Sequence, residues 1–258
     1  MSQNIHPTAI IDPSAELGAD VEIGAYAWVG AGVKLGAGCR VNHHASINGP
    51  SRIGQGNHFF PYASIGEKSQ DLKYKGEPTY VEIGDNNVFR EFTTVNRGTA
   101  PDAWTRIGSN NLFLTYSHVA HDCIVGSHTI FSNNATLAGH VEVGDYAIIS
   151  GLSAIHQFCR IGTHAIIGGC TKIVQDAPPF FIADGNPAEV RGVNAVGLQR
   201  KGFADENIKA LRAAYKILYD KSLNTSQAVD KLASEYADHP QVKILIDFVR
   251  SSQRGIIR

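Results

Sequence analysis

Residues 119–161 read VAHDCI VGSHTI FSNNAT LAGHVE VGDYAI ISGLSA IHQFCR I, and each six-residue block opens on a large apolar side chain. The same phase runs from Ile5 to Ile173 and contains 29 positions, of which 26 are large and apolar. The three exceptions are Asp71, Glu77 and Pro101. A single six-residue phase does not persist over so many residues by chance, so any fold assigned to the chain must first account for this repeat.

A six-residue period suits one short strand followed by one turn. Three such units make a triangular coil of 18 residues, and stacked coils form parallel ladders about 4.8 Å apart. One coil buries too little apolar surface to be stable alone, whereas a stack buries a continuous core. Glycine often follows the apolar residue, as in Ile23-Gly24 and Val125-Gly126, and we expect it to let the chain bend sharply. The period therefore predicts an all-β main domain that is a parallel β-helix of hexapeptide repeats.

Two segments interrupt the repeat. Residues 66–80, GEKSQDLKYKGEPTY, take the place of two blocks but are charged and polar. A shorter segment around Pro101, GTAPDAWT, breaks one further block. We expect both to project from the prism, where loops commonly carry function, although an insertion without a role is the alternative.

The period ends near residue 178, and a helical pattern follows Pro178, Pro179 and Pro187. Thr225 is a candidate N-cap, and Pro240 suits a first helical position. We therefore expect a β-helix over residues 1–190, with the projecting loop at 66–80, and a small C-terminal α-helical domain over 191–258. Three apolar helix faces are expected there: Ile208, Leu211, Tyr215 and Leu218; Val229, Leu232, Ala233 and Tyr236; Val242, Leu245, Ile246 and Val249.

Charge argues against some partners and suggests one. The net charge of −1 over 258 residues argues against a nucleic-acid binder. No apolar run is long enough to span a membrane, and no targeting signal opens the chain, so we expect a cytoplasmic location. Residues 195–258 hold 11 Lys/Arg and 7 Asp/Glu, a balance of +4, against 12 and 17 elsewhere. Such a helical domain would attract an acidic partner, although ordinary solvated helix faces would look the same.

Five of the eleven histidines fall close together in the repeat, and stacking by 18 residues predicts which ones meet. His121 should stack with Gly139 and Gln157, and Asp122 with His140 and Phe158, so His121 and His140 should lie roughly 5 Å apart. The five are His118, His121, His128, His140 and His156.

This arrangement has chemical content. A histidine is suited to general-base work at neutral pH, and the bare backbone N–H of Gly139 is suited to stabilising an oxyanion. A base beside such a donor suggests acyl transfer. Asp122 could orient the His121 ring only if the backbone turns there. The rival interpretation is a zinc site built from His118, His121 and His140, as in zinc hydratases with this kind of repeat; His128 and His164 are expected to be plain surface side chains.

The four cysteines, Cys39, Cys123, Cys159 and Cys170, form no CxxC motif. Cys123 and Cys159 share a column but sit two coils apart, roughly 10 Å by ladder spacing, which exceeds disulfide reach. Cys123 is also a conceivable nucleophile, but nothing requires it to face a cleft.

Five segments carry a more specific signal, and together they resemble the UDP-N-acetylglucosamine O-acyltransferase family. The resemblance covers the chain from end to end, including the terminal RGIIR, and it implies that the β-helix is left-handed. The segments are QDLKYKGEPT (70–79), HVAHDCIVG (118–126), NNATLAGHV (133–141), AIHQFCRIG (154–162) and GFADENIKALRAAYK (202–216).

The resemblance implies a role for individual residues. His121, which Asp122 could orient, matches the general base that deprotonates the sugar 3-hydroxyl, and Gly139 matches the oxyanion donor. Asp71 and Lys73 match loop residues that contact substrate. A further set matches positions that bind sugar, acyl chain, nucleotide and phosphate: His118, His140, His156, Gln157, Gly169, Asn194 and Arg200. Val196 and Lys201 stand where the family often has Glu and Arg, so we expect nucleotide and carrier contacts that differ in detail from those of relatives.

The resemblance also implies substrates and assembly. An (R)-3-hydroxyacyl group would pass from acyl carrier protein to UDP-N-acetylglucosamine, the first step of lipid A synthesis, without a metal or bound cofactor. Gly169 matches the position that limits acyl length, and a glycine there predicts a longer chain. A homotrimer with its site between subunits is expected. Alternatives are N-acylation of an amino-sugar nucleotide, a zinc hydratase and a purely structural solenoid.

Overall fold

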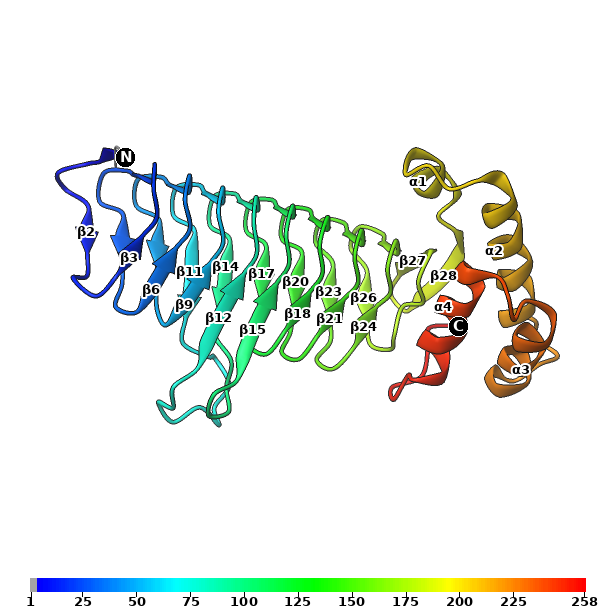
Figure 1. Ribbon diagram of the computed structural model, residues 1–258. Helices are drawn as coiled ribbons and strands as arrows, with labels where there is room; N and C mark the ends of the chain where they lie inside the picture. Colours follow the sequence, from blue (N-terminus) through cyan, green and yellow to red (C-terminus); the bar gives the residue numbers. More distant parts are fainter. Residues whose placement is uncertain (1–3) are drawn as a thin grey trace.

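The computed structural model describes residues 4–258, which form a three-sided prism followed by a group of helices (Figure 1). Three sheets make the sides of the prism, and the chain visits sheet A, then sheet B, then sheet C before it starts the next coil. The coils wind as a left-handed parallel β-helix, as expected.

Most strands are only two or three residues long, as a six-residue repeat requires. Sheet A contains β1 (Asn4–Ile5), β4 (Glu22–Ile23), β7 (Arg40–Val41), β10 (His58–Phe59), β13 (Val88–Phe89), β16 (Leu112–Phe113), β19 (Ile130–Phe131), β22 (Ile148–Ile149), β25 (Ile166–Ile167), β27 (Phe181–Gly185) and β28 (Ala188–Val193). Sheet B contains β2 (Ile10–Ile11), β5 (Trp28–Val29), β8 (Ser46–Ile47), β11 (Ser64–Glu67), β14 (Thr94–Asn96), β17 (His118–Val119), β20 (Thr136–Leu137), β23 (Ala154–Ile155) and β26 (Lys172–Ile173). Sheet C contains β3 (Glu16–Leu17), β6 (Val33–Leu35), β9 (Ser51–Ile53), β12 (Tyr80–Ile83), β15 (Trp104–Ile107), β18 (Ile124–Val125), β21 (Glu142–Val143) and β24 (Arg160–Ile161).

The strand register follows the sequence period. Strand β17 pairs with β20 through Val119 and Leu137, which are 18 residues apart. Where the two polar segments interrupt the repeat, the register is recovered beyond them: Ile53 pairs with Ile83, and Val95 with Val119. Both segments therefore loop out of the prism and leave the stack intact.

The turns between sheets form three edges, which we name after the sheets that they join: the A–B edge (for example 132–135), the B–C edge (120–123) and the C–A edge (126–129). The bend at most turns is made by a residue other than glycine in the left-handed region, such as Asp122 with φ 61°. Glycine after the apolar residue has a different role from the one expected. At Gly144 an added Cβ would lie 2.6 Å from the Thr163 backbone nitrogen, so glycine there permits coils to approach.

The prism is filled by the residues of the six-residue period. Phe59, Phe89, Phe113 and Phe131 stack through its centre, with ring centroids 5.1, 4.8 and 4.8 Å apart in succession. All four are fully buried. Since each ring rests on the rings of adjacent coils, the aromatic column joins several coils into one core.

Four helices cover the end of the prism: α1 (Ala195–Arg200), α2 (Asp205–Leu218), α3 (Thr225–Glu235) and α4 (Pro240–Arg250). The last three match the expected apolar faces, whereas the sequence did not reveal the short α1. The expected N-cap was wrong by one residue, because Asn224 caps α3 and forms a capping box with Gln227. The expected domain boundary at residue 190 falls inside β28, which pairs antiparallel with β27. Within residues 4–258, no helix has the length and apolar character to cross a bilayer.

Replacement of Phe113 by alanine should lower the free energy of unfolding by about 3–5 kcal/mol, because it opens a cavity in the aromatic column. Denaturant unfolding followed by circular dichroism measures the change. The matched control is Leu72→Ala, since Leu72 is 92% exposed and its truncation should cost less than about 0.5 kcal/mol. Equal losses in the two variants would contradict the central role of the column.

Candidate active site

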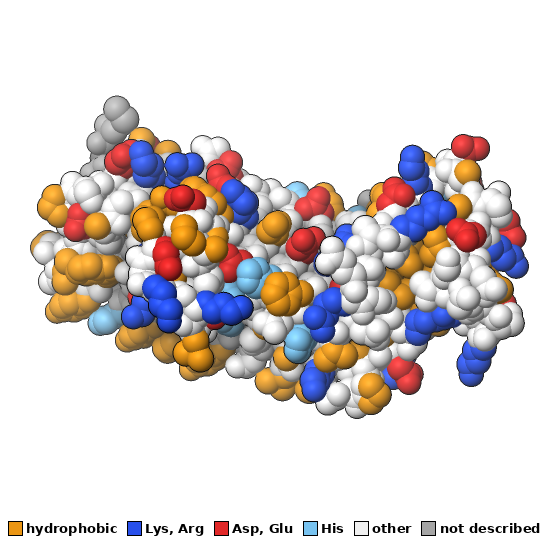
Figure 2. Space-filling model, turned by 90° about the horizontal axis from the view of Figure 1, so that it is seen from below, with side chains coloured by type: hydrophobic (Ala, Val, Ile, Leu, Met, Phe, Trp, Pro, Cys, Tyr) orange, Lys and Arg blue, Asp and Glu red, His pale blue; other side chains and the backbone are white. Residues whose placement is uncertain are grey.

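Both polar insertions leave the prism at the B–C edge, on the two coils that precede His121. The first lies between β11 and β12, and the second between β14 and β15. Backbone hydrogen bonds join their bases: Arg97 N–H donates to Glu67 O at 2.7 Å, and Asp102 N–H to Pro78 O at 2.8 Å. The two loops therefore form one projection, and histidine side chains are visible on the face between this projection and the C-terminal helices (Figure 2).

His121 and Asp122 form a close pair on this edge. His121 Nδ1 lies 2.8 Å from Asp122 Oδ2, and the two side chains are 12% and 9% exposed. The left-handed conformation of Asp122 supplies the backbone turn that this pairing requires. Burial alone would raise the pKa of Asp122, but hydrogen bonds from His121 and Thr99 hold the pKa of that carboxyl below its ordinary value. An ionised Asp122 can accept a hydrogen bond from Nδ1–H, which keeps that proton on Nδ1 and leaves Nε2 free to act as a base.

Gly139 lies directly beneath the His121 ring, as the stacking by 18 residues predicts. A Cβ on Gly139 would be 2.6 Å from His121 Nε2, so any larger residue would displace the ring. His140 N–H donates to His121 O at 3.1 Å, which fixes the relation of the two coils. The Gly139 N–H makes no hydrogen bond to any residue of 4–258, so this donor is available beside the His121 ring.

His140 completes the group from the next coil. Its ring lies 5.3 Å from that of His121 and stacks on Phe158 at 4.6 Å. Its Nε2 is 3.6 Å from Asp122 Oδ2. Among the described residues, one group of three side chains could ligate a metal ion. It consists of His121, Asp122 and His140, whose ligating atoms lie within 4.8 Å of one another. A cation held there would occupy His121 itself, and it would not use His118, which the zinc interpretation required.

The remaining histidine-rich positions lie beside this pair. His118 projects from β17, and its Nδ1 is 2.7 Å from Thr94 Oγ1. Burial lowers the pKa of His118, and the charge of His121 lowers it further. His156 and Gln157 are exposed on the same edge, one coil beyond Gly139. All of the histidines expected at the site, with Gln157, are thus grouped near the B–C edge.

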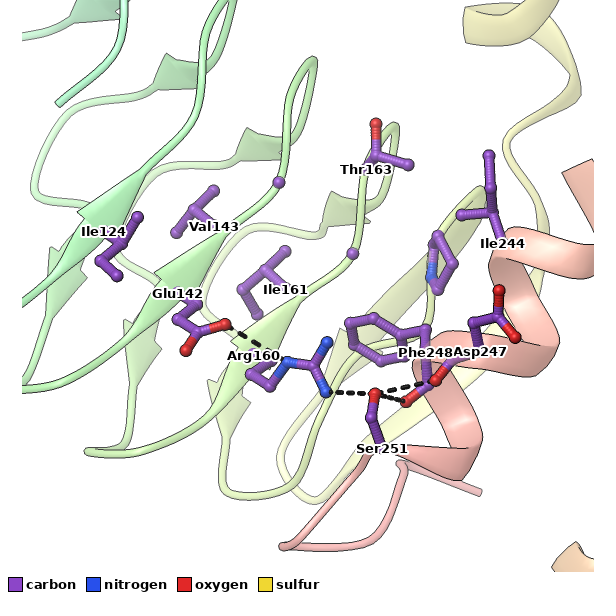
Figure 3. Close-up of a pocket in the computed structure, with 13 residues that line it drawn as sticks. Ile124, Glu142, Val143, Arg160, Ile161, Thr163, Ile244, Asp247, Phe248 and Ser251 are labelled. Carbon is purple, nitrogen blue, oxygen red and sulfur yellow. Dashed lines mark hydrogen bonds and ion pairs between the residues drawn. The ribbon is translucent and has the colours of Figure 1, made fainter. Parts of the chain in front are cut away.

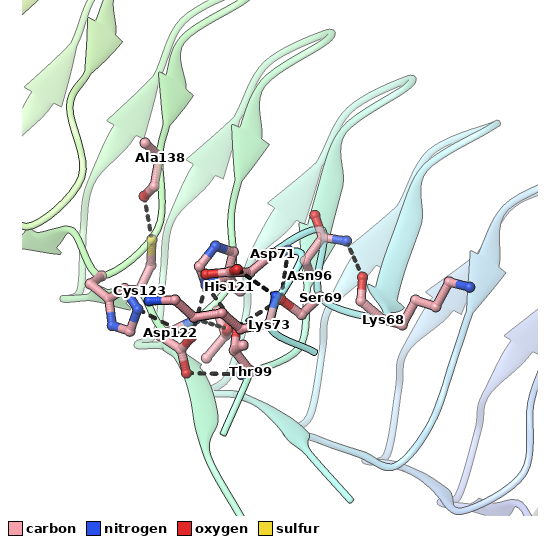
Figure 4. Close-up of polar contacts among 12 residues, drawn as sticks. Lys68, Ser69, Asp71, Lys73, Asn96, Thr99, His121, Asp122, Cys123 and Ala138 are labelled. Atoms are coloured by element: carbon pink, nitrogen blue, oxygen red, sulfur yellow. Dashed lines mark hydrogen bonds and ion pairs between the residues drawn. The ribbon is translucent and has the colours of Figure 1, made fainter. Parts of the chain in front are cut away.

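The longer projecting loop is tied to the pair through Thr99, a residue that the sequence analysis did not single out. Thr99 Oγ1 lies 2.9 Å from His121 Nδ1, and its N–H donates to Asp122 Oδ1 at 3.1 Å (Figure 4). Ser69 Oγ lies 2.7 Å from Thr99 Oγ1 and accepts the Asp71 N–H. Lys73 N–H in turn donates to Asp71 Oδ1 at 2.9 Å. The two loop residues expected to contact substrate are therefore connected to His121.

Three other expected positions lie on different edges of the same chain. Gly169 is exposed on the A–B edge, above Gly151. Asn194 and Arg200 line a cavity of about 350 Å³ on the C–A edge, together with Val196 and Lys201. Asn194 also caps α1, since its Oδ1 accepts the Gly197 N–H. One subunit alone does not bring these residues to His121.

A groove leads from the pair toward the helices. It has a volume of about 510 Å³ and is lined by Asp122, His140, Phe158, Arg160 and Gln253 among others. It continues into a second groove of about 430 Å³ between sheet C and α4 (Figure 3). Arg160 spans the two: its guanidinium donates to Ser251 Oγ at 3.0 Å and lies 4.4 Å above the Phe248 ring. An extended molecule could therefore reach Asp122 and His140 from the C-terminal domain.

Comparison with known proteins gives a consistent result. The model of a family described as UDP N-acetylglucosamine O-acyltransferase, domain 2, matches residues 176–257, and the bacterial transferase hexapeptide model matches 105–139. An acyl-[acyl-carrier-protein]–UDP-N-acetylglucosamine O-acyltransferase of Psychromonas ingrahamii is 64% identical over 98% of this chain and 97% of its own. One from Akkermansia muciniphila is 61% identical over 81% and 82%. The solved structure of LpxA from Acinetobacter baumannii superposes with a TM-score of 0.96, at 48% identity over 98% and 99% of the chains.

Cys123 follows the pair directly, yet it is unsuited to act as a nucleophile. Its side chain is fully buried and points toward Ala138 O, and burial raises the pKa of the thiol to about 12. We expect Cys123 to remain unmodified by a thiol-directed maleimide at pH 8 while the protein is folded, because the thiolate is the reactive form. Peptide mass spectrometry measures the modification, and denatured protein, in which all four cysteines should react, is the control. Rapid labelling of Cys123 in the folded state would contradict this placement.

Proposed function

The chain belongs to the UDP-N-acetylglucosamine O-acyltransferase family, and from this premise we propose that it transfers an (R)-3-hydroxyacyl group from acyl carrier protein to the 3-hydroxyl of UDP-N-acetylglucosamine. This reaction is the first step of lipid A synthesis. The observation that carries the assignment of the base is the buried His121–Asp122 pair above Gly139.

The proposed reaction is a direct transfer. His121 Nε2 takes the proton of the 3-hydroxyl while Nδ1–H remains bonded to Asp122, so that the imidazolium which forms lies against a carboxylate. The sugar oxygen attacks the thioester carbonyl carbon, and the Gly139 N–H stabilises the oxyanion. The carbon–sulfur bond then breaks, and the thiol of the carrier leaves with the proton returned by His121. The step needs no metal, no bound cofactor and no covalent enzyme intermediate.

The remaining residues are proposed to position the substrates. Asp71 and Lys73 contact them from the projecting loop, and the Lys73 ammonium supplies a point charge for a phosphate. Asn194 and Arg200 hold the nucleotide, with Val196 and Lys201 as local differences from relatives. Around His121 the sugar and acyl chain would be positioned by His118, His140, His156 and Gln157.

We propose that the working enzyme is a homotrimer with each site between two subunits. The support is the placement of the expected residues on three different edges of one prism, which only a second subunit can bring together. Acyl carrier protein, as an acidic partner, suits the helical domain, whose balance is +4. The groove toward His140 would then receive its acyl group. A cytoplasmic location stays a prediction.

His121→Ala should lower kcat by at least about 10³-fold in the transfer of label from UDP-N-acetylglucosamine to a lipid-like product, since the general base is lost. A panel of hydroxyacyl carrier proteins as donors gives chain length in the same assay. His6→Ala, an exposed histidine on the first coil, should retain wild-type activity. Absence of product from the folded wild type, or activity that a chelator abolishes and zinc restores, would contradict the proposed reaction.

Gly169→Met should abolish transfer from the longest accepted donor while leaving shorter donors active. A Cβ on Gly169 meets only Gly151 O, at 3.5 Å, so the variant can fold and the added side chain would project over the A–B edge. The ratio of kcat/KM for long and short donors should fall by more than about 10-fold, as expected when a chain is excluded from its groove. An unchanged ratio would remove Gly169 from the acyl-binding surface.

A further inference from the structure

Thr99 contacts both His121 and Asp122. Thr99 is 9% exposed, and it lies in the second insertion, 22 positions before His121 in the chain. Its hydroxyl meets His121 Nδ1 at 2.9 Å, and its backbone N–H donates to Asp122 Oδ1 at 3.1 Å. Asp122 is held from a further side, because its own N–H donates to Thr105 Oγ1 at 2.8 Å.

The hydrogen-bonding capacity of these groups limits their arrangement. When His121 acts as a base at Nε2, its Nδ1 carries a proton that both Asp122 Oδ2, at 2.8 Å, and Thr99 Oγ1, at 2.9 Å, can accept. Two acceptors for one N–H, supplied by different segments of the chain, restrict the rotation of the ring more than one acceptor does. With Asp122 alone, the ring could pivot about a single hydrogen bond.

The hydroxyl of Thr99 also connects the pair to the longer loop. Ser69 Oγ is 2.7 Å from Thr99 Oγ1, and Ser69 is 6% exposed. Ser69 Oγ accepts the N–H of Asp71, whose carboxylate accepts the N–H of Lys73. A series of hydrogen bonds thus runs from the loop to His121. It is exposed at the Asp71–Lys73 contact and buried at the Ser69–Thr99 contact. Neutral pairs buried in this way are costly to break on one side only.

We propose that Thr99 is a positioning residue for the transfer reaction, and that through Ser69 it couples the projecting loop to the orientation of His121. This inference rests on the proposed function of His121 as the base. The loop, once its Asp71 and Lys73 engage substrate, would hold Ser69 and Thr99 in place and so keep Nε2 aimed at the hydroxyl. The alternative is that the Ser69–Thr99 contact only fastens the two loops to each other.

The primary test compares steady-state kinetics of Thr99→Val and Thr99→Ser with the wild type. Valine keeps the shape and the N–H to Asp122 but removes the hydroxyl, so kcat should fall about 10- to 100-fold, the effect of one hydrogen bond to a charged group. KM for UDP-N-acetylglucosamine should change by less than about threefold, and serine should restore kcat to within about threefold of wild type. The matched control is Thr129→Val, which removes a fully buried hydroxyl bonded to Asn111 Oδ1 at 2.8 Å on the C–A edge and should leave kcat unchanged.

A double-mutant cycle with Ser69→Ala tests the coupling. If Ser69 acts through Thr99, its effect on kcat in the wild type should largely vanish in the Thr99→Val background. If the effects of the two substitutions on kcat multiply independently, the coupling is overturned. The positioning role is overturned if kcat of Thr99→Val stays within threefold of wild type, or if serine does not restore it. His121→Ala is measured beside them: if that variant stays active, the proposed base fails instead, and the two failures are distinguishable. Equal melting temperatures of Thr99→Val and Thr129→Val exclude a folding defect as the cause.

Discussion

The ladder hydrogen bonds between successive coils are the interaction on which this molecule depends. They set every side chain of one coil about 4.8 Å from its counterpart on the next, and the apolar side chains of the period fill the interior only in that register. The same ladders determine the outside of the prism. Gly139 lies under His121 because the two are 18 residues apart, just as Leu137 lies under Val119. Core and site are therefore two consequences of one spacing.

The B–C edge differs from the other edges in what the turns carry. A left-handed residue at the bend turns successive side chains to the same side, which is why Asp122 can reach the ring of its neighbour. The two insertions then enclose the pair on one side, and the groove beside His140 stays open toward the C-terminal segment. Rigid coils thus hold His121 and Asp122, whereas the loops hold the residues proposed to contact substrate, a division of roles that suits the precise placement of the proposed base.

The period made the β-helix, the two projecting segments and the stacking of His121 on Gly139 predictable from the sequence, because all three follow from counting in units of six and 18. Counting gave no information on Thr99: it lies within an insertion, whose path depends on tertiary contacts. The pairing of His121 with Asp122 depended on a backbone angle that the sequence does not reveal. Helix α1 has only six residues and no repeated apolar face, and Asn224 and Thr225 are adjacent residues that both suit an N-cap. The role of glycine was mistaken because close approach between coils is a property of the stack.

Both insertions return the chain to sheet C in the register that it would have had without them: Val81 pairs with Ser51, and Thr105 with Val81. A coil contacts only its immediate neighbours, so a change of length in either segment is not transmitted to the coils beyond. The two insertions can therefore change in length during evolution, while the stacked coils beneath them are under a separate and stricter constraint. The length of the insertions and the folding of the coils are in this way nearly independent, and a lineage can alter the first without having to re-establish the second.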